Sequence, residues 1–189
     1  MGTYGYISII AMLCYGFMLL MFLTAKRNRI INSFLVVLTG LLFWTGGSAF
    51  MRAQLWPGCE FWYQVSLLGI LLLPYAYYCF ILAFGGVKKS LPGKIYLAVM
   101  LICFVVNIRH GVFLGCPNVV EKNGLPTFVY EIKPTILVLF FPAGIFLIYL
   151  FLILVRICKA NPNMKVQYEP VMAGVLVLFA GNMLLGIPF

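Results

Sequence analysis

Apolar residues fall in six long stretches along the chain, and short polar segments separate the stretches. Each stretch is continuously apolar and does not alternate, which favours helices over the strands of a membrane barrel. A bilayer core about 30 Å thick takes roughly 20 residues per helix, so each stretch is long enough to span it. The pattern predicts an all-α integral membrane protein, a six-helix transmembrane bundle that forms one domain over residues 1–189. The expected helices cover residues 4–24, 33–51, 61–84, 95–114, 135–155 and 171–189.

Basic residues gather in alternate loops of this predicted bundle. The loops after the first, third and fifth stretches each carry three of them, whereas the basic residues of the other loops mix with glutamates. Cytoplasmic loops of membrane proteins collect lysine and arginine. We therefore expect the amino terminus and the end of the sixth helix to lie outside. The nine residues that set this orientation are Lys26, Arg27, Arg29, Lys88, Lys89, Lys94, Arg156, Lys159 and Lys165.

Composition narrows the classes of function. Hydrophobic residues make up 64% of the chain and charged residues 9%, which leaves no room for a separate soluble domain. The only acidic residues are four glutamates, and the sequence has no recognisable nucleophile, phosphate-binding or metal-binding motif. The net charge of +9 comes from the loop clusters and does not form one basic stripe. We expect no catalysis, no cofactor, no metal and no nucleic-acid partner.

A polar group near the outer end of the fourth stretch comprises Asn107, Arg109 and His110. At about 1.5 Å per residue, His110 lies roughly 22 Å from Ile95, in the outer third of the membrane. Asn107 and His110 share a helix face, and polar residues at this depth normally face the bundle interior or a cavity. One interpretation is a hydrogen bond between helices, and the other is contact with a ligand. A single histidine has too few partners for a metal site.

A second polar group surrounds the loop between the second and third stretches. Trp44, Arg52 and Glu60 lie in or beside this loop with further aromatic residues. Aromatic residues at this level commonly form an anchoring belt at the membrane interface. The alternative is that Arg52 and Glu60 pair with each other or hold a polar part of a ligand above the bundle. Both groups lie at the same predicted face of the membrane.

Two of the six cysteines, Cys59 and Cys116, fall in the predicted outer loops. The outer compartment permits disulfides. One hypothesis is that the two residues pair and tie the second loop to the longest loop, residues 115–133, and the sequence leaves this open. That longest loop is rich in turn-forming residues and is expected to form a lid or rim.

Several short motifs stand out: Lys26 to Arg29 with Trp44, Leu73-Pro74, Asn107 with His110 and Phe113, and Gly181-Asn182 to Pro188. They resemble the amino-terminal seven-transmembrane sensor region of bacterial histidine kinases and related signalling proteins. The resemblance implies a membrane input module, in the plasma membrane of a bacterium, that detects an extracellular or membrane-borne small molecule or peptide and relays the signal to a cytoplasmic output. Relatives of this kind commonly form homodimers. The chain stops at Phe189 on an apolar run, without the seventh helix and the output domain of the family, and the sequence leaves open whether these follow or whether the chain is a stand-alone relative.

Two other functions compete with the receptor hypothesis. In the receptor, a pocket among helices two to five would open outward and be lined by the two polar groups. The main alternative is the substrate-binding membrane subunit of a vitamin-type transporter, which fits the helix count but has both termini inside. A membrane-embedded enzyme that acts on lipid is the third hypothesis, and the missing carboxylates weigh against it.

Overall fold

The computed structural model describes residues 3–88, 90–122, 125–131 and 133–160, with two short pieces at 169–170 and 173–174. The chain divides into two compact units, Met1–Gly144 and Ile145–Phe189. The first unit contains the features that concern function.

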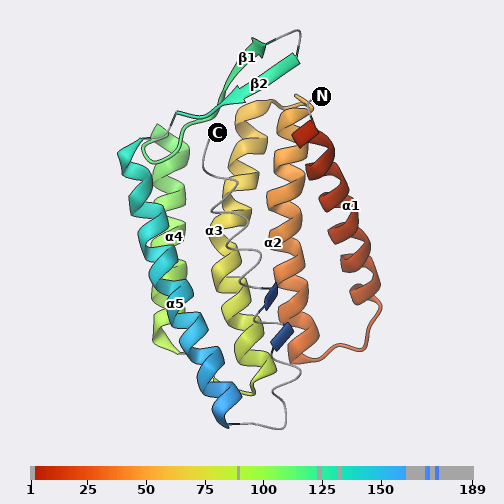
Figure 1. Ribbon diagram of the computed structural model, residues 1–189, viewed down its shortest axis with the longest axis vertical. Coiled ribbons are helices and arrows are strands. Elements are labelled where there is room, and N and C mark those ends of the chain that lie inside the picture. The colour runs from red at the N-terminus through yellow and green to blue at the C-terminus, as the bar shows by residue number, and fades with distance from the viewer. Residues whose placement is uncertain are drawn as a thin grey trace. The chain divides into compact units, whose positions relative to one another are not determined.

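The described residues form five helices long and apolar enough to cross a membrane, which confirms the all-α membrane fold (Figure 1). All five coincide with expected spans. The sixth expected helix, residues 171–189, lies outside the described residues except for one short piece. The five are α1 (Thr3–Leu23), α2 (Arg29–Arg52), α3 (Cys59–Phe84), α4 (Leu91–His110) and α5 (Leu137–Ala160).

Local signals place the ends of α2 and α3. Asn28 caps α2, and its side-chain oxygen accepts a hydrogen bond from the Ile31 backbone at 2.7 Å. The helix therefore begins four residues before the expected Ser33. Just beyond the C-terminal end of α3, Gly86 has a φ of 67°, a left-handed conformation that suits glycine and ends the helix.

The fourth helix begins and ends four residues earlier than the expected Ile95–Leu114. Pro92 lies in its first turn, where the missing N–H costs nothing, and Gly111 ends it with a φ of 54°. The prediction rested on hydrophobicity alone and therefore included residues 111–114, which lie beyond the end of the helix. As a correction, His110 is the last residue of α4, about 28 Å from its start, and so lies farther along the helix than the expected distance of roughly 22 Å.

The centre of the first unit is the contact between α2 and α3. More than half of each of these two spans is buried, whereas no residue of the α1 span is. Glycines allow the close approach, because a Cβ on Gly47 would lie 2.6 Å from the Ser66 backbone nitrogen. The Ser66 hydroxyl also donates to the Trp44 carbonyl at 2.9 Å. The two helices therefore pack backbone to backbone.

Tyrosines connect α3 to α4 in the half of α4 that begins at Leu91. The Tyr78 hydroxyl accepts a hydrogen bond from the Ser90 backbone at 2.8 Å, and the Tyr96 hydroxyl donates to the Leu71 carbonyl at 3.3 Å. Met100, one turn beyond Tyr96, is fully buried. Beyond Met100, α4 carries exposed apolar side chains, among them Ile102 and Val105, each 64% exposed.

A β-hairpin occupies part of the segment expected to be a lid or rim. Strands β1 (Asn118–Lys122) and β2 (Leu125–Val129) pair antiparallel, with Lys122 opposite Leu125. The short 3₁₀ helix η1 (Pro134–Ile136) follows and leads into α5. An Asn-Gly pair between two segments that contain apolar residues is a hairpin signal, and Asn123-Gly124 stands between β1 and β2 in the sequence. The expectation for this segment named a lid or rim and no hairpin.

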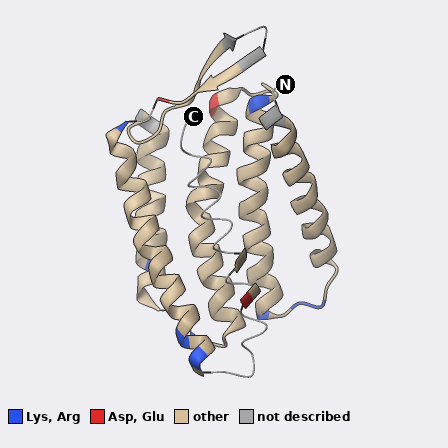
Figure 2. Cartoon of the chain, in the orientation of Figure 1, with Lys and Arg blue, Asp and Glu red and all other residues tan. Residues whose placement is uncertain are grey.

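Charges differ between the two ends of the first unit (Figure 2). We call the end that carries Lys26, Arg27 and Arg29 the basic end, and the end that carries the hairpin the hairpin end. Arg52 and Glu60, which close α2 and open α3, lie at the hairpin end. The arrangement matches the alternation of basic and mixed loops along the sequence.

Candidate functional site

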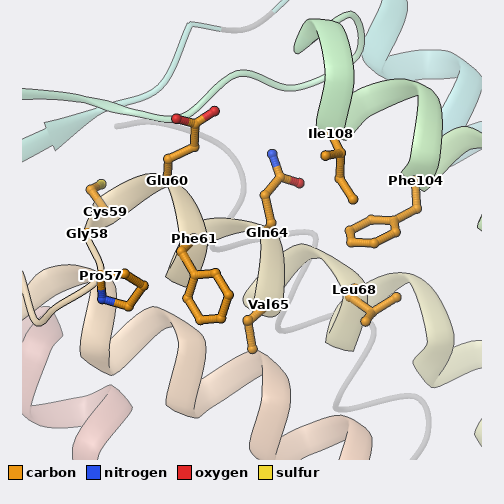
Figure 3. Close-up of a pocket in the computed structure, with 10 residues that line it drawn as sticks. All are labelled: Pro57, Gly58, Cys59, Glu60, Phe61, Gln64, Val65, Leu68, Phe104 and Ile108. Atoms are coloured by element: carbon orange, nitrogen blue, oxygen red, sulfur yellow. The ribbon is translucent and has the colours of Figure 1, made fainter.

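A groove lies between the beginning of α3 and the last turns of α4 at the hairpin end (Figure 3). Its volume is about 740 Å³, in the range typical of ligand pockets. The groove is open at its side, since about half of the surface of Phe61 and of Ile108 is exposed. The ten lining residues are Pro57, Gly58, Cys59, Glu60, Phe61, Gln64, Val65, Leu68, Phe104 and Ile108.

Helical periodicity brings these side chains to one place. On α3, Phe61, Gln64, Val65 and Leu68 recur at intervals of three and four, and on α4 Phe104 and Ile108 are four apart. The walls are apolar apart from Glu60 and Gln64 at the upper edge (Figure 3). A mostly apolar wall with a few convergent polar groups is the usual makeup of a small-molecule site.

Gln64 carries a buried acceptor. Its Oε1 atom is shielded from solvent and has no hydrogen-bond partner among the residues that the structure describes. Such an atom costs about 1–3 kcal/mol, and native proteins keep few of them. One helical turn earlier, Glu60 is exposed and places a carboxylate at the groove edge. Both side chains offer acceptor oxygens to a hydrogen-bond donor on a ligand, and a cationic donor would also be attracted by the charge of Glu60.

Asn107 is fully buried, and its side chain binds the loop that follows α4. Its Oδ1 accepts from the backbone nitrogens of Phe113 and Leu114, both at 3.0 Å, and its Nδ2 donates to the Leu114 carbonyl at 3.0 Å. Three of its four hydrogen-bonding positions are therefore occupied within the chain. The partners belong to a loop and not to a second helix, so this arrangement differs from both interpretations drawn from the sequence.

Other predicted site residues on α4 lie beside the groove. Arg109 and His110 are the last two residues of the helix and follow the groove residue Ile108. Their side chains lie outside the part of the structure that is described. Their roles remain predictions.

Arg52 and Trp44 are placed apart from the groove. The Arg52 guanidinium lies 5.6 Å from the centre of the Phe128 ring, so the hairpin covers the end of α2. The Nε atom of Arg52 is buried and has no hydrogen-bond partner in the described part of the chain. The ring of Phe128, and not the carboxylate of Glu60, is the contact observed for Arg52. Trp44 is half-buried in the α2–α3 contact, about 12 Å along α2 from Arg52.

Cys59 and Cys116 come together at the edge of the groove. Their sulfur atoms are 3.4 Å apart, and both residues are partly exposed. Burial first, and then the hydrogen bond and charge of Cys59, raise the pKa of the Cys116 thiol to about 12. In the same cluster, burial raises the pKa of Tyr130, and the nearby Arg52 lowers it in part.

Sequence reasoning found Glu60 and the two cysteines and missed most of the groove. Gln64 was the available signal, because an amide inside an apolar span is costly and is commonly functional. The apolar lining residues gave no signal, since phenylalanine, isoleucine and leucine at helical spacing also describe lipid-facing surfaces. Only the structure shows which of them face the groove.

The spans and the groove define a multi-pass α-helical membrane protein. Over residues 7–188 the sequence matches the family described as the N-terminal 7TM region of histidine kinase, and the chain belongs to this family. The resemblance inferred from the short motifs is thereby confirmed. Comparison with curated proteins and with solved structures found no match.

Proposed function

We propose that this chain is the input module of a signalling protein, and that it detects a small amphipathic molecule in the groove between α3 and α4. The observation that carries the proposal is the buried acceptor of Gln64 in the wall of that groove, which no described residue binds. Membership of the sensor family supports the general role. The basic end would face the cytoplasm of a bacterial cell, and the hairpin end would face outside.

The groove chemistry suggests what the ligand contains. A hydrogen-bond donor, favourably a cation, would satisfy Gln64 and pair with Glu60, and an apolar part would cover Leu68 and Phe104. The open side of the groove would admit a molecule from the lipid or from the outer surface. Arg109 and His110 remain proposed contacts because they follow Ile108, whereas Asn107 would act by holding the loop.

The relay would depend on the part of the α3–α4 contact that lines the groove. Tyr78 and Tyr96 hold α4 against α3 away from the groove, so a ligand between the other halves would change the angle between the helices. A ligand shifts such an equilibrium only if it binds one arrangement more tightly than the other. The groove would therefore favour one of two arrangements and pass the change toward the basic end.

The substitution Gln64→Leu tests the proposal because it separates signalling from stability. Leucine removes the acceptor at similar volume, so we expect the purified protein to unfold at an equal or higher temperature while the response falls several-fold. The response is measured in a strain that lacks the gene, where transcripts altered by the deletion are first identified. The wild-type or the variant gene is then returned to the strain, and the levels of those transcripts are compared.

Gln54→Asn serves as the matched control. Gln54 is exposed at the hairpin end outside the groove and has a φ of 51°, which asparagine tolerates. The control should restore wild-type transcription at equal membrane abundance. Full restoration by Gln64→Leu would reject the site, and a deletion that alters no transcript would reject the signalling role.

A further inference from the structure

We propose that Cys59 and Cys116 form an intramolecular disulfide at the edge of the groove. Their sulfur atoms already lie 3.4 Å apart, although 57 positions separate the residues in sequence. Each is partly exposed, so a reaction partner can reach it. The proposal concerns a covalent modification and holds whatever the groove binds.

Separate contacts bring each cysteine to this place. Cys59 is the first residue of α3, and its backbone position is set by the helix. Cys116 lies two residues beyond Leu114, whose carbonyl accepts hydrogen bonds from Asn107 at 3.0 Å and from the Tyr63 hydroxyl at 3.2 Å. The following residue, Pro117, is buried. These contacts hold the loop against α3 without the sulfur atoms, so the pair is arranged before any bond forms.

The chemistry requires an oxidant, and we assign that role to the disulfide of an extracytoplasmic thiol oxidase. One thiolate attacks the oxidase disulfide, forms a mixed disulfide and releases one oxidase thiol. The second cysteine then attacks the mixed disulfide, forms the Cys59–Cys116 bond and releases the other oxidase thiol. Two protons and two electrons pass from the cysteine pair to the oxidase.

The bond would join two segments that frame the groove. Cys59 lines the groove, and Cys116 belongs to the segment between α4 and β1. A covalent link here would keep the end of α4 from moving away from the start of α3. The link would also lower the conformational entropy of the unfolded chain and so stabilise the folded protein.

The test counts free thiols in the full chain after it is expressed in its membrane, trapped at low pH and denatured. A polymer-linked maleimide should add to four of the six cysteines before reduction and to all six after reduction. Six additions before reduction would overturn the proposal. A non-reduced band at twice the mass would also overturn it, since the bond would then join two chains.

Two substitutions make the count specific. Cys59→Ser should give five additions with and without reduction, because Cys116 is then free. Cys14→Ser, which removes a cysteine on α1, should give three additions before reduction and five after. The wild-type count decides the matter on its own if either variant fails to fold. A Cys59→Ser count that still rises on reduction would assign the bond to other cysteines.

Discussion

At the residue scale, Asn107 and Gln64 show how two amides within apolar helices serve different ends. Asn107 uses its side chain within the protein, where it binds three backbone groups of one loop. Gln64 has an acceptor in the wall of a groove that stays without a partner in the described structure. Burial of an amide therefore does not decide its role, but its remaining hydrogen-bonding capacity does.

The substitution Asn107→Ala should destabilise the protein. It leaves the N–H groups of Phe113 and Leu114 without their acceptor, which costs about 2 kcal/mol. Thermal unfolding of the purified protein in detergent should occur several degrees lower. The control is Val105→Ala, on an exposed part of the same helix, with 64% of Val105 exposed. Equal unfolding temperatures for the two variants would contradict the structural role of Asn107.

The sequence could indicate that residues 107–110 matter, but it could not show how. The spacing of Asn107 and His110 suggested a shared helix face, and both residues do lie in α4. The predicted helix continued to residue 114. The helix ends at His110, and Gly111 turns the chain so that Phe113 and Leu114 return to Asn107. Local turn geometry of this kind depends on contacts that hydrophobic periodicity does not describe.

At the element scale, the α2–α3 pair forms the most tightly packed part of the first unit. A Cβ on Gly69 would meet the Trp44 backbone nitrogen and would lie 2.8 Å from the Gly40 carbonyl oxygen. These are backbone atoms of α2, and they cannot rotate away as a flexible side chain can. The small residues of the two helices therefore set the distance between them.

Gly69→Ala should force α2 and α3 apart and lower stability by about 1–3 kcal/mol. The fluorescence of Trp44, which lies in this contact, should report the change during thermal unfolding. Gly16→Ala is the matched control, because a Cβ there would meet only the Leu42 Cδ2 atom at 3.9 Å. An equal effect of the two substitutions would show that close packing at Gly69 contributes nothing.

The helices were predicted from the sequence and the hairpin was not, for a physical reason. Lipid requires every backbone group within a span to be satisfied internally, so long apolar stretches leave few choices. The segment from Asn118 to Val129 lies outside the predicted spans, and that constraint does not apply to it. There the sequence signals are the Asn-Gly pair and the β-branched residues of the two strands, and these signals are shorter than a stretch of about twenty apolar residues.

At the scale of the whole molecule, we propose that the hairpin end of the first unit lies outside the cell. The hairpin lies opposite the basic loops of the first unit (Figure 2). The groove and the cysteine pair lie at the hairpin end. An outward groove can meet an external signal, and outward cysteines can meet an oxidising partner. Both proposals therefore rely on the orientation set by lysine and arginine.

The orientation is tested most directly by cysteine labelling in intact cells. In a chain without its native cysteines, Val129→Cys places an exposed thiol on the hairpin and Lys26→Cys places one at the basic end. A membrane-impermeant maleimide should label Val129→Cys in intact cells and Lys26→Cys only after the membrane is opened. Labelling of Lys26→Cys in intact cells, with Val129→Cys protected, would reverse the orientation and remove the basis for an outward-facing sensor.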